Sequence, residues 1–542
     1  MASPSQKLAE SLEVLRGVQD AGRGAAIRTR DLTRTHRERL VANGFLREVI
    51  RGWYIPARPG EAPGESTAWY AAFWSFAAAY LEARFGRNWA LSPEQSISLH
   101  GGNWTVPRQL VVRAPRARNK ITPFPHGTSL FDLRAALPAP ADREETAGLR
   151  VFPLETALVE CSPSCFSHRA TDVRAALATI RDASGLLARL LAGGHSTIAG
   201  RLAGAFRNNG RTAVADEILE TMAAAGYAVR ETDPFADRPA LALPFRQTSP
   251  YVNRIKLSWQ KMREPVIARF PKAPGLPRNA RAYMKGVDEA YVSDAYHSLS
   301  IEGYRVTPDL IERVRSGTWN PDGNQQDREH HNAMAARGYW QAYRAVQESI
   351  GNVLEGHSPG EVARGDHRAW YRELFAPSVA AGLLRPADLA GYRSGPVYIR
   401  ESKHVPMNRD AVLDVMPTFF DLLRDETDAA VRVVLGHVVF VYIHPYMDGN
   451  GRMGRFLMNV MMAAGGYPWT VIPVTERKAY MGALEKASVG EDIGPFANFL
   501  ARLVERRLAG EPLPTPGSIM NHTKSGRVEP EQWRRRGRPI PE

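Results

Sequence analysis

Residues 444–455 combine groups that could handle a phosphate ester. The segment reads His-Pro-Tyr-Met-Asp-Gly-Asn-Gly-Arg-Met-Gly-Arg. A glycine-rich turn that enters a helix exposes backbone N–H groups at the positive end of the helix dipole, and these groups bind phosphate. Gly449 and Gly451 allow positive φ and the close approach of an anion, and Asn450 adds a side-chain donor between them. The segment therefore predicts an anion cradle.

Charged and titratable side chains complete this segment. Asp448 offers a hard carboxylate suited to Mg²⁺ beside phosphates. Arg452 and Arg455, three residues apart, can project from one helix face toward the same polyphosphate. His444 titrates in the range of a general base. Each part alone fits a turn, a solvated helix face or a structural histidine, but eight specified positions within twelve arise by chance at roughly one in 10⁷. We therefore interpret them as one catalytic set.

The string resembles the signature of the Fic family, His-Pro-Phe-x-Asp/Glu-Gly-Asn-Gly-Arg-x-x-Arg, with Tyr446 in place of the phenylalanine. Tyrosine keeps the aromatic anchor and adds a hydroxyl that needs a partner. The resemblance covers roughly residues 251–508. It implies a protein adenylyltransferase that moves AMP from ATP to a Ser, Thr or Tyr hydroxyl of a protein target, or of the chain itself, with Mg²⁺ as cofactor.

The resemblance also implies a role for each matching residue. His444 would take the proton of the acceptor hydroxyl, and Asp448 would hold Mg²⁺ between the α- and β-phosphates. Asn450, with the amides of Gly449 and Gly451, would stabilise the charge that develops on the α-phosphate. Pyrophosphate would leave.

An upstream segment, Ser298-Leu299-Ser300-Ile301-Glu302-Gly303, resembles the family's inhibitory motif, Ser/Thr-x-x-x-Glu-Gly/Asn. The resemblance implies that Arg452 holds the β-phosphate and Arg455 the γ-phosphate, and that Glu302 of the inhibitory helix pairs with Arg455. ATP would then bind with displaced phosphates. Because a misplacement of about 1 Å can cost on the order of 10²-fold in rate, Glu302 is expected to restrain transfer.

Two further segments are expected near the site. Residues 391–406 resemble the family's flap, a β-hairpin that positions the target by strand addition, with Val397, Tyr398 and Ile399 as the positioning residues. Tyr480 resembles a family tyrosine that lies near the nucleotide's base, although a core position explains it nearly as well.

These groups must be positioned by a multidomain chain, since 542 residues exceed one ordinary domain. The fold class we expect is a mainly α Fic fold with a β-hairpin flap, preceded by a winged-helix and mixed α/β N-terminal region. The Val-rich run 431–443 favours a strand on propensity, but the resemblance implies a buried helix. The expected units are a winged-helix-like head over 1–60, a mixed α/β region over 61–236, a Pro-rich linker and lead-in over 237–278, the Fic domain over 279–508 with its inhibitory helix near 290–303, and a basic disordered tail over 509–542.

The head begins with apolar residues at helical spacing. A helix that Thr35 can cap follows and runs to about Asn43. Two short strands that turn near Arg51-Gly52 come after it. This order is typical of a winged helix, so DNA is a candidate partner. A solvated arginine face is the alternative. The arginines that could contact phosphates are Arg28, Arg30, Arg34, Arg37, Arg39, Arg47 and Arg51.

The second region mixes element types: an aromatic helix over 69–85, a strand over 109–113 and helices between 169 and 225. Together with the head, the segments 96–101 and 151–158 resemble the AbiEi-type antitoxins of bacterial abortive-infection systems. That resemblance implies a DNA-binding, self-repressing module.

Composition is compatible with these expectations. The net charge is +13 and the pI about 9.7, which favours an anionic partner such as a nucleotide or nucleic acid. Cys161 and Cys165 cannot form a four-ligand zinc site and are expected to be buried thiols in a reducing compartment. The N-terminus lacks a secretory signal and the run 431–443 is too short to span a bilayer. We therefore expect a cytoplasmic protein without membrane contact.

Two other functions fit the same residues. One is the reverse reaction, removal of AMP from a modified protein, in which Glu302 would position water. The other is a DNA-binding, antitoxin-like regulator whose Fic domain only senses ATP, although nucleotide binding alone gives His444 no purpose. The 444–455 loop is expected to contact the phosphates more than the base of the nucleotide, so UTP, GTP or CDP-choline remain alternative donors.

Overall fold

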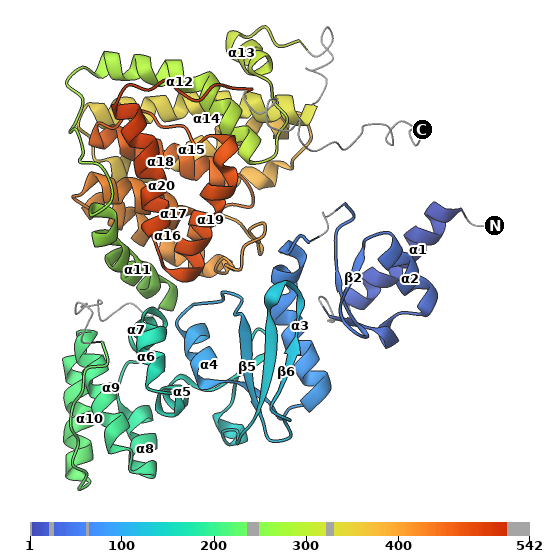
Figure 1. The fold of residues 1–542 in the computed structure, drawn as a ribbon, viewed down its shortest axis with the longest axis vertical. Helices are drawn as coiled ribbons and strands as arrows, with labels where there is room; N and C mark the ends of the chain where they lie inside the picture. Colours follow the sequence, from blue (N-terminus) through green and yellow to red (C-terminus); the bar gives the residue numbers. More distant parts are fainter. Residues whose placement is uncertain (1–2, 21–25, 61–63, 236–248, 321–329, 518–542) are drawn as a thin grey trace.

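The computed structural model describes the chain except for residues 1–2, 21–25, 61–63, 236–248, 321–329 and 518–542. A small N-terminal head leads to an α/β unit, then to a group of short helices, and finally to a large helical bundle that forms the second half of the chain (Figure 1). The bundle carries the candidate site, so the other units matter here for how they contact it.

The head is built from two helices and a three-stranded sheet. Ser3 caps the first helix, and Thr33, not the predicted Thr35, caps the second. The predicted turn between two strands is present, with Gly52 at φ 83°. Leu15, Ile27 and Leu40 form the centre of its small core. The elements are α1 (Pro4–Val18), β1 (Ile27–Arg28), α2 (Arg34–Ala42), β2 (Leu46–Ile50) and β3 (Trp53–Pro56), in sheet order β1-β3-β2 with all pairs antiparallel.

The predicted aromatic helix packs on a four-stranded sheet. Trp69, Phe76 and Phe124 meet edge to face in its core, as aromatic pairs prefer. The sheet order is β4-β5-β7-β6, in which β5 and β7 are parallel. The elements are α3 (Thr67–Phe85), β4 (Ala90–Leu91), α4 (Pro93–His100), β5 (Gln109–Ala114), β6 (Lys120–Pro123), β7 (Ser129–Arg134) and the hairpin β8 (Glu144–Thr146) with β9 (Leu149–Val151).

A group of short helices follows and has its own core. Gly200 lies where a Cβ would collide with the carbonyl oxygen of Arg230, so the close approach of the chain there requires glycine. Cys161 and Cys165 are free and buried, as predicted. The helices are α5 (Leu154–Glu160), α6 (Ser164–His168), α7 (Ala170–Leu177), α8 (Ser184–Gly193), α9 (Ser196–Asn208) and α10 (Thr212–Ala224).

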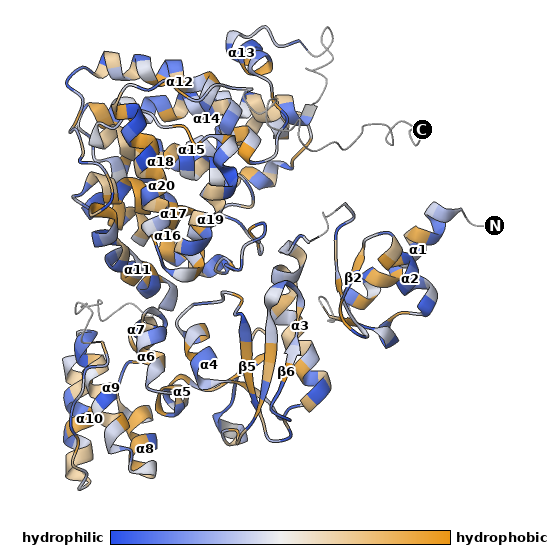
Figure 2. Cartoon of the chain, viewed as in Figure 1, coloured by the Kyte–Doolittle hydropathy of each residue, from blue (hydrophilic) through white to orange (hydrophobic). Residues whose placement is uncertain are grey.

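The second half of the chain forms a helical bundle around one continuous core that runs from Val252 to Val504. Its centre is the pair α17 and α18, and Figure 2 shows hydrophobic residues gathered along α16, α17, α18 and α20. The helices are α11 (Pro250–Ile267), α12 (Ala280–Ile301), α13 (Pro308–Ser316), α14 (His330–Leu354), α15 (Pro359–Ala380), α16 (Arg409–Asp425), α17 (Ala429–Ile443), α18 (Asn450–Gly465), α19 (Arg477–Gly490) and α20 (Gly494–Leu508). Single 3₁₀ turns lie at Thr29–Asp31, Pro125–Gly127, Pro140–Asp142, Pro386–Leu389 and Val474–Glu476.

The Val-rich run 431–443 is helical, as the family resemblance implied. Asp428 begins this helix by accepting a hydrogen bond from the amide of Val431 at 3.0 Å. Burial on nearly every side outweighs the strand propensity of valine. Among the described helices, none is long and apolar enough to cross a membrane.

Two expected boundaries need correction. The lead-in predicted over 237–278 contains α11, whose Val252 and Ile255 lie in the core of the bundle, so the bundle begins near residue 250. The tail predicted to be disordered over 509–542 is in place at least to residue 517: Leu513 packs on the core, and the carbonyl of Pro514 accepts a hydrogen bond from Ser293 at 2.7 Å. Residues 518–542 lie outside the described part of the chain.

Candidate functional site

The predicted base stands where α17 ends. His444 adopts left-handed backbone angles, φ 54° and ψ 59°, and its amide still donates to Phe440. Its Nδ1 lies 3.2 Å from the carbonyl oxygen of Val441. A nitrogen that faces a carbonyl must carry the proton, so Nε2 is the unprotonated nitrogen that can accept one. Burial lowers the pKa of His444 to about 4, which keeps the ring neutral at pH 7.

The anion cradle forms at the start of α18. Gly449 is its N-cap at φ 79°, and a Cβ there would lie 2.8 Å from Cε2 of Phe375. The first amides of α18 have no partner within the helix and point toward the loop, as in other phosphate-binding helix starts. Gly449 is favoured by its positive φ, whereas a Cβ at Gly451 would displace Oε1 of Glu302, which shows how closely that carboxylate approaches the cradle.

Asn450 closes the loop. Its Oδ1 accepts from the amide of Tyr446 at 2.9 Å, and its Nδ2 donates to the Tyr446 carbonyl at 2.8 Å. The side chain is 2% exposed. Because Nδ2 carries two N–H donors, the contact of this side chain with the α-phosphate stays a prediction beside its structural role.

Arg455 is held by α12 in the manner the inhibitory motif predicted. Its Nε donates to Oγ of Ser298 at 2.8 Å, and one terminal nitrogen donates to Oε1 of Glu302 at 2.7 Å. Arg455 is 3% exposed. Burial alone would raise the pKa of Glu302, but Arg455 and Arg452 outweigh it and hold that pKa below its ordinary value. Glu302 is therefore an ionised carboxylate directly over the cradle.

Arg452 lies between two aromatic rings. Its guanidinium carbon is 5.1 Å from the ring of Tyr304 and 5.0 Å from that of Phe375, which are cation–π distances. A terminal nitrogen donates to Oδ2 of Asp448 at 3.1 Å, and Nε is buried without a hydrogen-bond partner. The two rings hold the guanidinium of Arg452 in place. Its Nε, which has no partner among the described residues, is a donor that suits an incoming phosphate.

Asp448 and Tyr446 differ strongly in exposure. The side chain of Asp448 is 68% exposed, whereas Tyr446 is fully buried and stacks on Tyr371 with ring centres 3.9 Å apart. Tyr446 therefore serves as the aromatic anchor, but its hydroxyl, which was expected to need a partner, has none among the described residues.

The flap differs from the expected hairpin. Residues 391–408 are all described, and none of them forms a paired strand. Their backbone groups bond elsewhere: the amide of Arg393 donates to the carbonyl of Pro445 at 2.9 Å, and the Lys403 carbonyl accepts from Val106. Val397 is buried and Tyr398 is 45% exposed. The hairpin prediction is wrong for this structure because the two arms bond to different parts of the molecule.

Tyr480 belongs to the core. It is 1% exposed and its hydroxyl lies 2.8 Å from Nε2 of His437. The ring packs near Phe496 and Phe499 of α20. Tyr480 thus takes the core position that the sequence explained nearly as well, and its contact with a nucleotide base stays a prediction.

Three contacts at the site were not anticipated. Tyr304 and Phe375 enclose Arg452, and Arg393 donates from Nε to the carbonyl oxygen of His444 at 2.8 Å. Arg393 could have been noticed, because it lies in the Gly-Tyr-Arg that precedes the flap. The two aromatic residues carry no local signal, since Tyr304 approaches Arg452 from the segment after α12 and Phe375 from α15.

Comparison with known proteins agrees with this geometry. Residues 363–462 match the Fic/DOC family. The protein adenylyltransferase Fic of Drosophila willistoni is 30% identical over 231 residues, which are 42% of this chain and 43% of that protein. The protein of the same name from Nematostella vectensis is 27% identical over 259 residues, 47% of this chain and 56% of that protein. The chain thus spans about half the length of the curated relatives it matches.

Solved structures with likeness to the chain include Fic-1 from C. elegans, at 19% identity and a TM-score of 0.36, covering 64% of this chain and 96% of that one. A Fic domain containing protein from Bacteroides thetaiotaomicron is 18% identical with a TM-score of 0.34, covering 48% and 99%. The matched range 363–462 contains the whole 444–455 segment together with the helices that hold it. The match to the Fic/DOC family therefore lies within the helical bundle, over residues 363–462.

Proposed function

We propose that the chain transfers AMP from ATP to a hydroxyl of a protein, and that Glu302 restrains this reaction. The observation that carries the proposal is the pair between Glu302 and Arg455, 2.7 Å apart, above a helix start whose amides are free for an anion. The similarity to proteins named protein adenylyltransferase Fic supports the nucleotide and the reaction class.

The transfer follows from the positions of the side chains. Nε2 of His444 takes the proton of the acceptor hydroxyl, whose oxygen attacks the α-phosphorus in line. The bond from that phosphorus to the bridging oxygen breaks, and pyrophosphate leaves. The first amides of α18 stabilise the charge on the α-phosphate. Arg452, fixed between its two rings, binds the β-phosphate, and Arg455 binds the γ-phosphate when Glu302 releases it.

The residues present fit a magnesium ion. Asp448 supplies one exposed carboxylate at the mouth of the cradle, and Mg²⁺ in nucleotide sites commonly takes one or two carboxylates plus phosphates and water. Bound there, the ion would neutralise charge on the phosphates. No group of three or more His, Cys, Asp or Glu side chains occurs among the described residues, so the phosphates must complete the coordination.

Glu302 restrains transfer through charge and position. Its carboxylate occupies the guanidinium that the γ-phosphate needs and lies beside the amides of the cradle. ATP that binds around it carries its phosphates out of line, and about 1 Å of displacement costs on the order of 10²-fold in rate.

The test compares the wild-type chain with Glu302→Gly, using ATP labelled at the α-phosphate, added protein and Mg²⁺. We expect label on protein to rise roughly 10-fold or more in the variant, given this geometric sensitivity. Glu289→Gly, on an exposed turn of the same helix, is the control for the loss of a glutamate to glycine. If Glu302→Gly binds ATP but labels no more protein than the wild type, the restraint does not exist.

The reverse reaction is the second candidate, since an ionised Glu302 beside the cradle could orient a water toward an AMP-modified side chain. Under that function Glu302→Gly loses the ability to strip AMP from a modified protein. The same set of variants therefore separates the two directions.

The head adds a further proposal, that it is a winged-helix module that binds DNA and makes the chain a regulator. Arg30 and Arg51 are exposed and free to contact phosphates. The other arginines of the predicted surface bond within the chain: Arg28 to Asp31, Arg34 to Glu38, Arg37 to Thr29, Arg39 to Lys7 and Ser11, and Arg47 to Glu65. A DNA contact would thus centre on Arg30 and Arg51.

A further inference from the structure

The carboxyl half of the flap, residues 400–405, is attached to the N-terminal part of the chain. The amide of Glu401 donates to Oγ1 of Thr67 at 3.0 Å, at the first turn of α3. Nε of Arg400 lies 3.3 Å from a carboxylate oxygen of Glu65. The amide of Val106 donates to the carbonyl of Lys403 at 2.9 Å. Three flap residues, Arg400, Glu401 and Lys403, therefore bond to one unit, residues 64–151, which we call the α3 platform.

The same half of the flap is held from the bundle. The amide of Lys403 donates to Oε1 of Glu485 on α19 at 3.0 Å, and Ser402 donates to the same carboxylate. Nε2 of His404 donates to the carbonyl of Tyr442 at 2.8 Å, and the two rings stack 4.1 Å apart. The segment is thus clamped between the platform and the helix that ends at the catalytic histidine.

The amino half of the flap is open. Within the described residues, the amides of Val397, Tyr398 and Ile399 make no hydrogen bond, and Tyr398 is 45% exposed. The carbonyl of Ile399 accepts from the amide of Ser402 at 3.2 Å, whereas the unpaired amides are the groups with which a second, extended chain pairs. Since this open edge continues directly from the clamped half, the position of the clamp decides where an incoming peptide lies.

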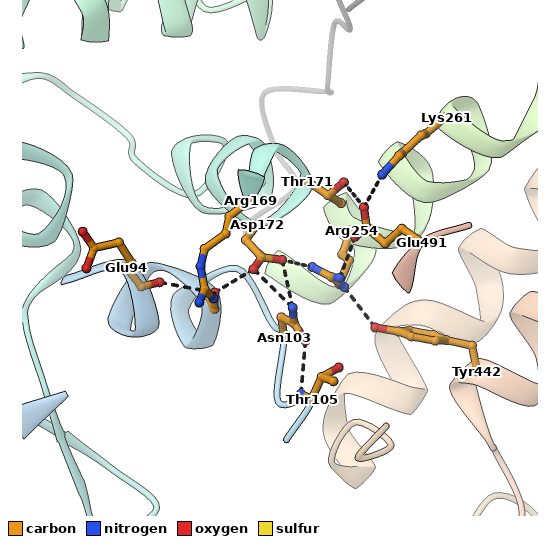
Figure 3. Close-up of polar contacts among 11 residues, drawn as sticks. Glu94, Asn103, Thr105, Arg169, Thr171, Asp172, Arg254, Lys261, Tyr442 and Glu491 are labelled. Atoms are coloured by element: carbon orange, nitrogen blue, oxygen red, sulfur yellow. Dashed lines mark hydrogen bonds and ion pairs between the residues drawn. The ribbon is translucent and has the colours of Figure 1, made fainter. Parts of the chain in front are cut away.

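A buried polar cluster keeps the platform side of the molecule and the bundle in one arrangement (Figure 3). Arg254 of α11 is 4% exposed and bonds to three acceptors: Asp172 of α7, Glu491 after α19 at 2.8 Å, and the hydroxyl of Tyr442 at 3.0 Å. Asn103 of the platform donates to Asp172 at 3.1 Å. Buried charges with several partners tolerate little displacement, because any loss leaves a charge unpaired.

From these contacts we propose that the α3 platform positions the docking edge for the protein that receives AMP, with Glu65 and Thr67 as positioning residues. The partner is an extended segment of that protein, which pairs with residues 397–399 of the flap. This inference rests on the proposed function for its substrate, whereas the clamp itself is independent of catalysis. The head is connected too, because Arg47 donates to the carbonyl of Glu65 at 2.8 Å.

The clamp is tested first without any substrate. Thr67→Val removes the acceptor for the Glu401 amide and keeps the shape of the side chain, Thr67→Ser restores the hydroxyl, and Thr122→Val on β6 is the matched control. In the full chain we expect amide exchange over 397–404 and tryptic cleavage after Arg400 and Lys403 to rise at least 3-fold in Thr67→Val alone. Equal exchange and cleavage in all four proteins would overturn the proposal.

The consequence for transfer is measured in the Glu302→Gly background with ATP labelled at the α-phosphate and the full-length His444→Ala chain as acceptor. Adding Thr67→Val should raise the KM for the acceptor several-fold while the KM for ATP stays the same, and Thr67→Ser in its place should restore the acceptor KM. An unchanged acceptor KM despite faster exchange would overturn the positioning role. If Glu302→Gly releases no pyrophosphate at all, the proposed function fails, and the exchange result still decides the clamp.

Discussion

Arg455 makes the catalytic loop and the inhibitory helix depend on each other. Its Nε and one terminal nitrogen bond to Ser298 and Glu302, and the other terminal nitrogen is buried without a hydrogen-bond partner among the residues that the structure describes. One turn earlier on α12, Asp294 accepts from the hydroxyl of Tyr339 at 2.6 Å, and burial raises the pKa of Asp294 to about 6. Ser298 and Glu302 bind different nitrogens of the Arg455 guanidinium. A phosphate could therefore replace Glu302 while the contact with Ser298 stays.

The first prediction concerns this pair. Glu302→Gly should raise transfer, and adding Arg455→Ala should cancel most of the gain, because the freed guanidinium is gone. The double variant isolates the coupling between the two residues. Initial rates with labelled ATP give the four values of the cycle. Additive effects would mean that the two residues act separately, in contradiction to the contact at 2.7 Å.

The second prediction concerns the base. His444→Ala should abolish transfer and leave ATP affinity nearly unchanged, because the ring faces the acceptor and the phosphates bind to α18. Since the pKa of His444 is lowered to about 4, the ring is unprotonated above that value. The rate in Glu302→Gly should therefore stay level from pH 8 to pH 5. A rate that falls with a midpoint near pH 6.5 would show an ordinary, solvated histidine.

At the scale of elements, α12 is fixed at its end by groups distant in sequence. Arg477 donates from Nε to the carbonyl of Ile301 at 2.8 Å, and His297 accepts from the amide of Val474 at 3.3 Å. The segment after α20 crosses the same helix, where Pro514 accepts from Ser293. The C-terminal segment thus helps to keep Glu302 over the cradle.

The third prediction tests that segment. Deleting residues 511–542 removes the acceptor of Ser293 and the contact of Leu513 with the core, so α12 should exchange its amides faster and basal transfer should rise several-fold. Deleting only residues 518–542 is the control, because it keeps Pro514. If both deletions leave the amide exchange of α12 and the basal transfer rate at the wild-type level, the C-terminal segment covers the surface of the bundle without restraining α12.

The sequence predicted those parts of the site that are contiguous. The 444–455 loop could be read from its motif, since each residue type is needed at a fixed spacing, whereas the pairing of Glu302 with Arg455 was implied only by the resemblance to the family's inhibitory motif. The flap could not be read in this way, because its arms bond to Val106 and Pro445, which no local pattern reveals. Asn450 was assigned to phosphate because its side chain could donate, and only the fold shows that Tyr446 uses both of its polar groups.

At the scale of the whole molecule, the net charge of +13 raises the question of an anionic partner beyond ATP. The fourth prediction is that Arg30→Ala with Arg51→Ala lowers affinity for duplex DNA and reduces the slope of log K against log salt by about 2, at about 0.9 per phosphate contact. Arg116→Ala, an exposed arginine outside the head, is the control. If deletion of residues 1–60 leaves affinity and slope unchanged, the head is a packing or interaction unit.

The fifth prediction concerns acid stability, which the bundle's buried histidines should dominate. His367, His404 and His437 are each under 5% exposed, and burial lowers their pKa values to about 4, 3 and 4 from 6.5. Between its lowered pKa and 6.5, each of these histidines binds a proton in the unfolded chain but not in the folded chain. The free energy of unfolding therefore falls as the pH drops from 6.5 toward 4. At 1.36 kcal/mol per pKa unit, these shifts correspond to at most about 3 kcal/mol each for His367 and His437 and at most about 5 kcal/mol for His404.

Asp294 opposes this trend, because its raised pKa of about 6 means that the folded state binds the proton more tightly and gains stability below pH 6. Three groups outweigh one, so the urea midpoint should fall steeply between pH 6.5 and 4. His367→Gln removes one titrating ring that bonds on both sides, from Nδ1 to Ala363 and at Nε2 to Tyr392. Its midpoint should change less with pH than that of the wild type, whereas the exposed His357→Gln should follow the wild type. A His367→Gln slope equal to the wild-type slope would mean that this ring takes up its proton in the folded chain as readily as in the unfolded one.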